Sequence, residues 1–105
     1  MIAEKVIIAH SFVSRLIGLV GKKSLPEGSA LVLKPCNSIH TCLMRTPIDV
    51  VFLDGQGTVV RLIPEMPPYK YSGIISGARK VAELPPGAIS RNDVRIHDVL
   101  KLMGD

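Results

Sequence analysis

The sequence predicts one mostly β domain over residues 1–105, a β-sandwich or barrel with one or two short helices. Apolar runs rich in β-branched residues recur along the chain, and proline, glycine or other turn-forming residues separate them. About six or seven such runs are present, with room for only short helices between them. Hydrophobic residues make up 47% of the chain, which is enough for a substantial core. An α+β arrangement is the alternative.

The N-terminal part predicts a strand followed by a helix. Residues 5–10 (KVIIAH) are apolar and β-branched, as in a strand. Ser11 or Ser14 can cap a helix that carries apolar residues on one side and ends at Gly21. Residues 25–28 (LPEG) then predict a turn, because proline fixes φ and glycine accepts a positive φ.

The middle of the chain predicts a series of short strands. They fall at residues 30–33, 36–44, 48–53 and 58–63. The last two are predicted to pair as a hairpin, because the residues between them, DGQG, are typical of a short connection between antiparallel strands.

The C-terminal part begins with a long irregular loop at residues 64–77, which contains three prolines, two glycines and two tyrosines. A strand at 79–84 is ended by Pro85, Pro86 and Gly87. Beyond it we expect a short helix at 88–93 and a final strand, bent or paired, at 94–103.

The charge pattern argues against several classes of partner. The net charge of +4 comes from scattered Lys and Arg residues, and aromatic residues make up only 4% of the chain. A nucleic-acid-binding protein more often has a clustered basic stripe, so nucleic-acid binding is not predicted. No apolar segment is long enough to span a membrane, and no signal peptide is evident. We therefore expect a cytoplasmic protein with reduced cysteines and no cofactor; no residue pattern defines the oligomeric state.

The segment from Cys36 to Met44 contains the residue types best suited to chemistry. In an extended strand Cys36, Ser38, His40, Cys42 and Met44 would share one face. His40 and Cys42 could begin a zinc or copper site, although a complete site needs further ligands. A cysteine activated by His40, with Asp49 orienting the imidazole, could instead act as a nucleophile. The third interpretation, which we favour, is that the cysteines and Met44 pack in the core.

Three strings in the same order resemble the family called domain of unknown function 192. They are SRLIGLVGKKSLPEGSALVL, CNSIHTCLMRTPIDVVFLDGQGTVV and GARKVAELPPG, which fall within residues 14–87, and the resemblance as a whole spans residues 14–103. The resemblance implies a jelly-roll-like, mostly β domain without an established activity. The family pattern falls on Gly18, Gly21, Leu25, His40, Met44, Asp49, Phe52, Asp54, Gly57, Glu83, Leu84, Pro85 and Gly87.

The chain departs from the family pattern at two places. Cys42 and Leu43 stand where family members often have an aromatic pair, so the resemblance does not support chemistry at Cys42. His97 precedes Asp98 where the family usually has glycine. Some branches also have Trp in place of His40, which favours packing or ligand contact over catalysis for this histidine.

We therefore predict a non-enzymatic binding or accessory module for a small molecule or a protein partner. The predicted site lies where His40, Met44, Asp49 and Arg79 approach the loop at residues 64–77. Asp49 and Arg79 would anchor polar groups, His40 and Met44 would form the wall, and Tyr69 or Tyr71 would cover the ligand.

Overall fold

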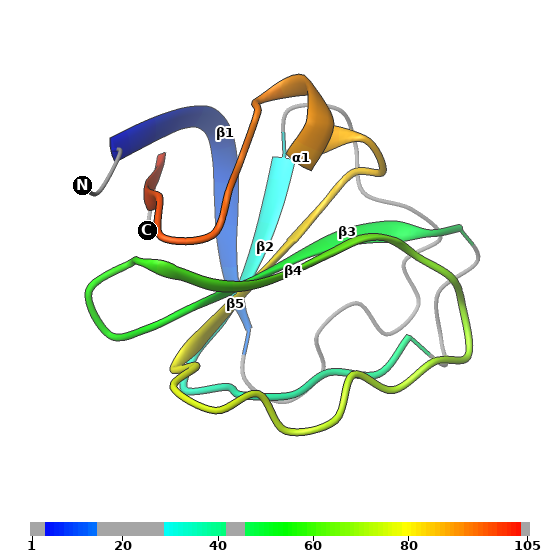
Figure 1. The fold of residues 1–105 in the computed structure, drawn as a ribbon. Helices are drawn as coiled ribbons and strands as arrows, with labels where there is room; N and C mark the ends of the chain where they lie inside the picture. Colours follow the sequence, from blue (N-terminus) through cyan, green and yellow to red (C-terminus); the bar gives the residue numbers. More distant parts are fainter. Residues whose placement is uncertain (1–3, 15–28, 42–45, 104–105) are drawn as a thin grey trace.

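The fold is known from a computed structural model, which describes residues 4–14, 29–41 and 46–103. Within these ranges the chain forms six strands and one short helix (Figure 1). In order they are β1 (Glu4–Ser14), β2 (Ser29–Leu33), β3 (Ile48–Leu53), β4 (Val59–Met66), β5 (Lys80–Leu84), α1 (Ala88–Arg91) and β6 (Val99–Met103).

All six strands belong to one mixed sheet in the order β4-β3-β5-β2-β1-β6. β1 runs parallel to both of its neighbours, whereas the other pairs are antiparallel. The sheet curls, because an isolated bridge joins Thr58, just before β4, to Val99 of β6. The Val59 amide donates to the Asp98 carbonyl (2.7 Å) and the His97 amide donates to the Val59 carbonyl (2.9 Å). The two edge strands of the sheet therefore meet at this end.

The mostly β class with a short helix is confirmed. The two sheets of a jelly-roll-like sandwich are not confirmed, because the strands of the described ranges hydrogen-bond into one sheet. The predicted hairpin is confirmed, with β3 pairing antiparallel to β4. The predicted strands at 30–33 and 79–84 and the helix at 88–93 correspond to β2, β5 and α1 within one or two residues at each end.

Three predicted elements differ from the structure. The final strand predicted at 94–103 begins only at Val99, since residues 94–98 are irregular. The other two predictions differ in the type of structure. A helix beginning at Ser11 is wrong, because β1 continues to Ser14 and residues 11–14 pair with β2. The rest of that predicted helix lies outside the described residues. The predicted strand at 36–44 is also wrong in its described part, where residues 36–41 form only an isolated bridge between His40 and Tyr71. In both cases pairing with distant segments decides the local structure.

Apolar side chains cover both faces of the sheet. The helix-side core contains α1 and consists of Ala30, Val32, Val51, Leu53, Val59, Ala82, Leu84, Ala88, Ile89, Val94 and Leu100. The loop-side core, on the opposite face, consists of Leu31, Ile39, Ile48, Val50, Phe52, Met66, Ala78 and Val81. Successive residues of β3 alternate between the two cores, so this strand is buried along its whole length.

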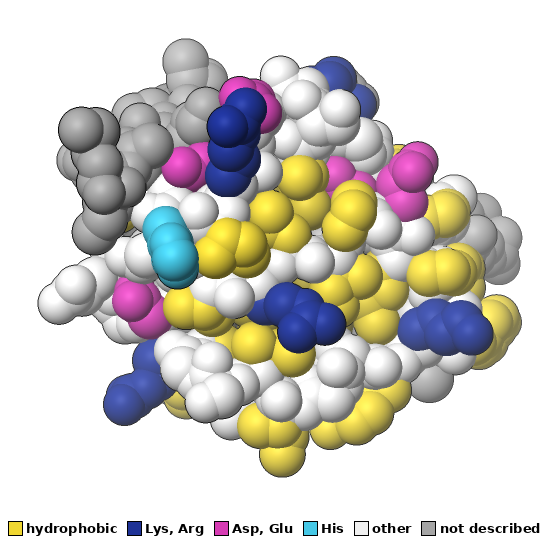
Figure 2. Space-filling model, viewed as in Figure 1, with side chains coloured by type: hydrophobic (Ala, Val, Ile, Leu, Met, Phe, Trp, Pro, Cys, Tyr) yellow, Lys and Arg dark blue, Asp and Glu magenta, His cyan; other side chains and the backbone are white. Residues whose placement is uncertain are grey.

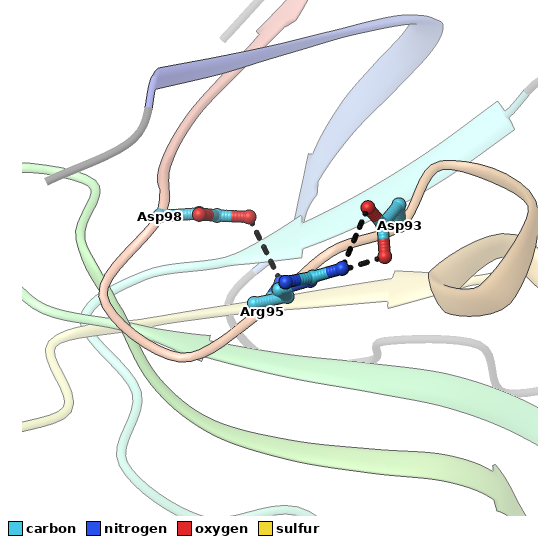
Figure 3. A network of polar contacts seen from close by, with 3 residues as sticks. All are labelled: Asp93, Arg95 and Asp98. Carbon is cyan, nitrogen blue, oxygen red and sulfur yellow. Dashed lines mark hydrogen bonds and ion pairs between the residues drawn. The ribbon is translucent and has the colours of Figure 1, made fainter.

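The turn before β6 closes the curled sheet (Figure 3). Asp98 is buried, and its Oδ2 accepts a hydrogen bond from the Arg95 amide (2.9 Å). The Arg95 side chain binds Asp93 at 3.2 Å, but this ion pair is exposed and contributes little to stability. His97 has a φ of 78°, so the left-handed conformation expected of glycine is present here with histidine.

Asp49 connects three elements from within the protein. Its side chain is fully buried on β3, on the same face as the helix-side core. Its Oδ1 accepts a hydrogen bond from the Glu65 amide (2.8 Å), and its Oδ2 accepts one from the Ile89 amide (2.7 Å). Ile89 is the second residue of α1, whose N-cap, Gly87, has no side chain to offer. Asp49 thus caps the helix from a distant strand.

Glu83 is a buried carboxyl group on the other face. It lies in β5 between its partners Leu31 of β2 and Val50 of β3, both in the loop-side core. Directly paired residues project to the same face, so Glu83 has apolar neighbours on both sides. The residue is only 5% exposed. Burial raises the pKa of its carboxyl group from 4.5 to about 7.

We predict that Asp49→Asn lowers the free energy of unfolding by about 2–4 kcal/mol, because one buried backbone N–H would then face the donor NH₂ of asparagine. The matched control is Asp54→Asn. Asp54 accepts the amides of Gln56 and Thr58 through one oxygen, Oδ1, which asparagine retains, so its cost should stay below about 1 kcal/mol. Urea unfolding measures both variants, and equal small losses would contradict the role of Asp49.

We predict that Glu83→Gln changes how stability depends on pH. Glu83 binds its proton more tightly in the folded chain than in the unfolded chain, so its stabilising contribution is complete below about pH 4.5. That contribution is lost as the pH rises through about 7, and the loss amounts to at most about 3 kcal/mol. Urea unfolding of the wild type and of Glu83→Gln at pH 5 and pH 8 measures this loss of stability. The wild type should lose more stability than the variant; parallel losses would refute this.

Candidate functional site

Two irregular segments lie antiparallel to each other across the loop-side core. We call residues 36–41 and 67–79 the loop pair; they run together along the lower side of the molecule in Figure 1. Backbone hydrogen bonds of 2.8–3.0 Å join them at Cys36–Arg79, Asn37–Ile75, Ile39–Ser72, Thr41–Lys70 and Thr41–Tyr69. The side chains of Ile39, Ile75 and Ala78 pack on the loop-side core. The long loop is therefore anchored along its length.

Thr41 fixes one end of the loop pair. Its side chain is buried, and its Oγ1 donates a hydrogen bond to the Pro67 carbonyl (2.6 Å) and accepts one from the Lys70 amide (2.9 Å). Its backbone bonds Lys70 and Tyr69 as well. Tyr69, inside this bonded turn, has a φ of 62°, an uncommon conformation for an aromatic residue. The bonds of Thr41 on both sides hold it there.

The outer side of the loop pair is rich in apolar side chains. Tyr69 is 76% exposed, Tyr71 is 65% exposed and Ile74 is 73% exposed. His40 is also exposed, and its bridge to Tyr71 places both side chains on the same side. We call His40, Tyr69, Tyr71 and Ile74 the tyrosine surface. Figure 2 shows hydrophobic side chains along the lower margin of this face, where the loop pair runs.

The structure brings together only part of the predicted site. His40 and Tyr71 are paired by the isolated bridge, and Tyr69, two residues before Tyr71, is exposed as well. Arg79 is exposed, but its carbonyl accepts the Cys36 amide at the far end of the loop pair, four residues from His40 along the first segment. Asp49 faces α1 on the opposite side of the sheet, with both oxygens bonded to amides. Met44 lies outside the described residues.

The proposed cysteine chemistry has little support from the described segments. Cys36 is half-buried against the loop-side core, and its Sγ donates a hydrogen bond to the Ser38 carbonyl (3.0 Å). His40 is exposed, so these residues do not form the shared strand face that the sequence suggested. Cys42 lies outside the described residues. Elsewhere in the described ranges, no three His, Cys, Asp or Glu side chains gather closely enough to hold a metal ion.

Sequence reasoning missed Thr41 as the residue that organises the site. The alternation of residues 36–44 did place Ile39 and Thr41 on the face opposite His40, and the structure agrees, since both are buried. No local signal linked a threonine hydroxyl to a turn 26 to 29 residues later in the chain.

Among the helices formed by the described residues, none is long and apolar enough to cross a membrane.

The fold is similar to that of two solved structures. One is a protein of unknown function from Novosphingobium aromaticivorans DSM 12444, with a TM-score of 0.70 and 16% identity over 83% of this chain and 70% of the other. The second is a proposed transcription regulator from Sinorhizobium meliloti 1021, with a TM-score of 0.70 and 15% identity over 83% of this chain and 76% of the other. At such low identity these likenesses concern the fold alone.

A comparison with curated proteins found no match. The sequence profile of the DUF192 family, described as an uncharacterized ACR, matches residues 2–102. This match covers nearly the whole chain and confirms the resemblance seen in the three sequence strings. The chain therefore belongs to the DUF192 family.

Proposed function

We propose that this protein is a non-enzymatic binding module and that it binds its partner through the tyrosine surface. The observation that carries the proposal is the exposure of Tyr69, Tyr71 and Ile74 on a backbone that is hydrogen-bonded along its length. Large apolar side chains gathered on a surface are typical of interaction sites. Tyrosine is also among the residues that contribute most to binding when it is buried by a partner.

The rigid backbone supports the same proposal. A mobile loop would lose conformational entropy on binding, whereas the bonds from Thr41, Ile39 and Asn37 restrain this one in advance. The left-handed conformation of Tyr69 costs free energy that the fold supplies elsewhere. Such strain at an exposed aromatic side chain supports a role in recognition.

The predicted site residues have different parts in this proposal. His40 lies beside Tyr71 and supplies a polar contact next to the rings, and Arg79 supplies a charge at the other end of the loop pair. Met44 lies outside the described residues, so the proposal assigns it no contact. Asp49 acts indirectly, by holding β4 and α1 in place.

The proposal includes a cytoplasmic location, as expected from the sequence. The metal hypothesis needs Cys42 together with His40, and the thiol-enzyme hypothesis needs Cys42 or Cys36. Cys42 lies outside the described residues, and no observation on the described residues favours either hypothesis.

We predict that small-molecule fragments bind preferentially at the tyrosine surface. In protein-observed NMR, fragment hits should shift the amide resonances of residues 39–41 and 69–75 more than those of the rest of the chain. Tyr71→Ser should weaken these hits by about tenfold or more, because the ring supplies much of the apolar contact.

The matched control is Ile96→Ser, since Ile96 is a large exposed hydrophobic residue (43%) outside the loop pair. It should leave fragment binding unchanged. Fragment shifts centred elsewhere on the protein, or hits that Tyr71→Ser does not weaken, would refute the proposed binding surface.

A further inference from the structure

The segments that carry the tyrosine surface have charges of one sign only. Residues 34–41 and 67–80 contain Lys34, Lys70, Arg79 and Lys80 and no Asp or Glu. Lys70 and Arg79 are exposed, whereas Lys34 and Lys80 are half-buried and make contacts of their own. In Figure 2, Lys and Arg side chains lie beside hydrophobic ones in the lower half of this face, and Asp and Glu lie mainly in the upper half. All charged residues of these two segments are thus basic, and an exposed lysine, Lys70, stands between Tyr69 and Tyr71 in the chain.

The two exposed charges lie at opposite ends of the loop pair. Lys70 pairs with Thr41, and Arg79 pairs with Cys36, five residues away along the other segment. Five fully extended residues span about 17 Å, so the separation along this irregular segment is at most about that distance. An extended peptide covers this distance in about five residues. Two acidic residues up to about five positions apart, with apolar residues between them, would match both charges and the apolar side chains.

Nucleic acid fits the same surface less well. A single strand needs a continuous basic track for its closely spaced phosphates and flat rings on which its bases stack. Here the two exposed charges are far apart, and Ile74, which is aliphatic, is as exposed as the tyrosines. Aliphatic side chains are better matched by the side chains of a polypeptide.

We propose that the tyrosine surface binds an extended acidic segment of another protein. Apolar side chains of that segment contact Tyr69, Tyr71 and Ile74, and its carboxylates lie next to Lys70 and Arg79. Apolar contact supplies most of the affinity, and charge complementarity supplies selectivity and speeds association. This inference rests on the proposed function and names the class of partner.

The test is a selection from a phage-displayed library of random 16-residue peptides on the intact protein, followed by fluorescence anisotropy with the most enriched peptide. Enriched peptides should contain more Asp and Glu than the input library, spaced up to about five residues apart around apolar residues. Binding of that peptide should weaken at least tenfold in Tyr71→Ser and remain unchanged in Ile96→Ser.

Charge reversals test the electrostatic part. Lys70→Glu and Arg79→Glu should each weaken peptide binding about fivefold or more at low ionic strength. The matched control is Arg91→Glu, because Arg91 lies on α1, over the helix-side core, on the opposite face of the sheet. It should change affinity less than twofold.

The outcomes separate this inference from the proposed function. Peptides that need Tyr71 but show no excess of Asp and Glu would overturn the acidic partner and leave the binding surface intact. Peptides that bind equally well to Tyr71→Ser would overturn both. A selection that enriches no peptide would also overturn the acidic partner. So would a twenty-residue oligothymidine that binds more tightly than the peptides and needs Tyr71 and Lys70. In either case, the fragment mapping described above decides whether the tyrosine surface binds any ligand.

Discussion

The geometry of the tyrosine surface depends on the buried hydroxyl group of Thr41. This group donates to the Pro67 carbonyl and accepts the Lys70 amide, while the Thr41 backbone bonds the residues beside it. Few side chains can donate and accept at one atom, and a hydroxyl group does both. Without it, two partly buried backbone groups would lose their partners, and the turn that holds Tyr69 at a positive φ would lose its main restraint.

The sheet explains why the surface forms where it does. Both faces of β3 are buried, so neither face of the sheet is open to a ligand at this strand. The helix-side face is occupied by α1, which Asp49 caps, and the loop-side face is covered by the loop pair. Because Ile39, Thr41 and Ala78 fill the space against the sheet, the intervening residues, including His40 and Tyr71, project outward. The exposed side chains on this side of the molecule therefore belong to the layer that covers the sheet.

Local sequence signals predicted the parts of the fold that depend on local chemistry. The DGQG turn predicted the β3–β4 hairpin, and Asp54 stabilises that turn by accepting two amides. The signals failed where distant pairing decides the structure. Residues 11–14 join β2 instead of starting a helix, and residues 36–41 pair with a loop instead of forming a regular strand.

The candidate site was predicted in part for the same reason. The long loop and its tyrosines were recognisable from composition, and His40 does lie beside Tyr71. The direction of Asp49 could not be read from sequence, since an aspartate after a turn can point to either face of a strand. Asp49 is buried because the backbone amides of Glu65 and Ile89 donate to its carboxylate. These residues are 16 and 40 positions away in the chain, so no local pattern indicates the contacts.

Amide hydrogen exchange at Tyr69 and Lys70 tests most directly whether Thr41 holds the tyrosine surface in place. In the wild type both amides should be protected, since one donates to the Thr41 carbonyl and the other to its hydroxyl group. Thr41→Val should speed their exchange by about tenfold or more and leave the Phe52 amide in β3 unchanged, while Thr41→Ser should preserve protection. Rapid exchange in the wild type, or equal protection in Thr41→Val, would contradict the account.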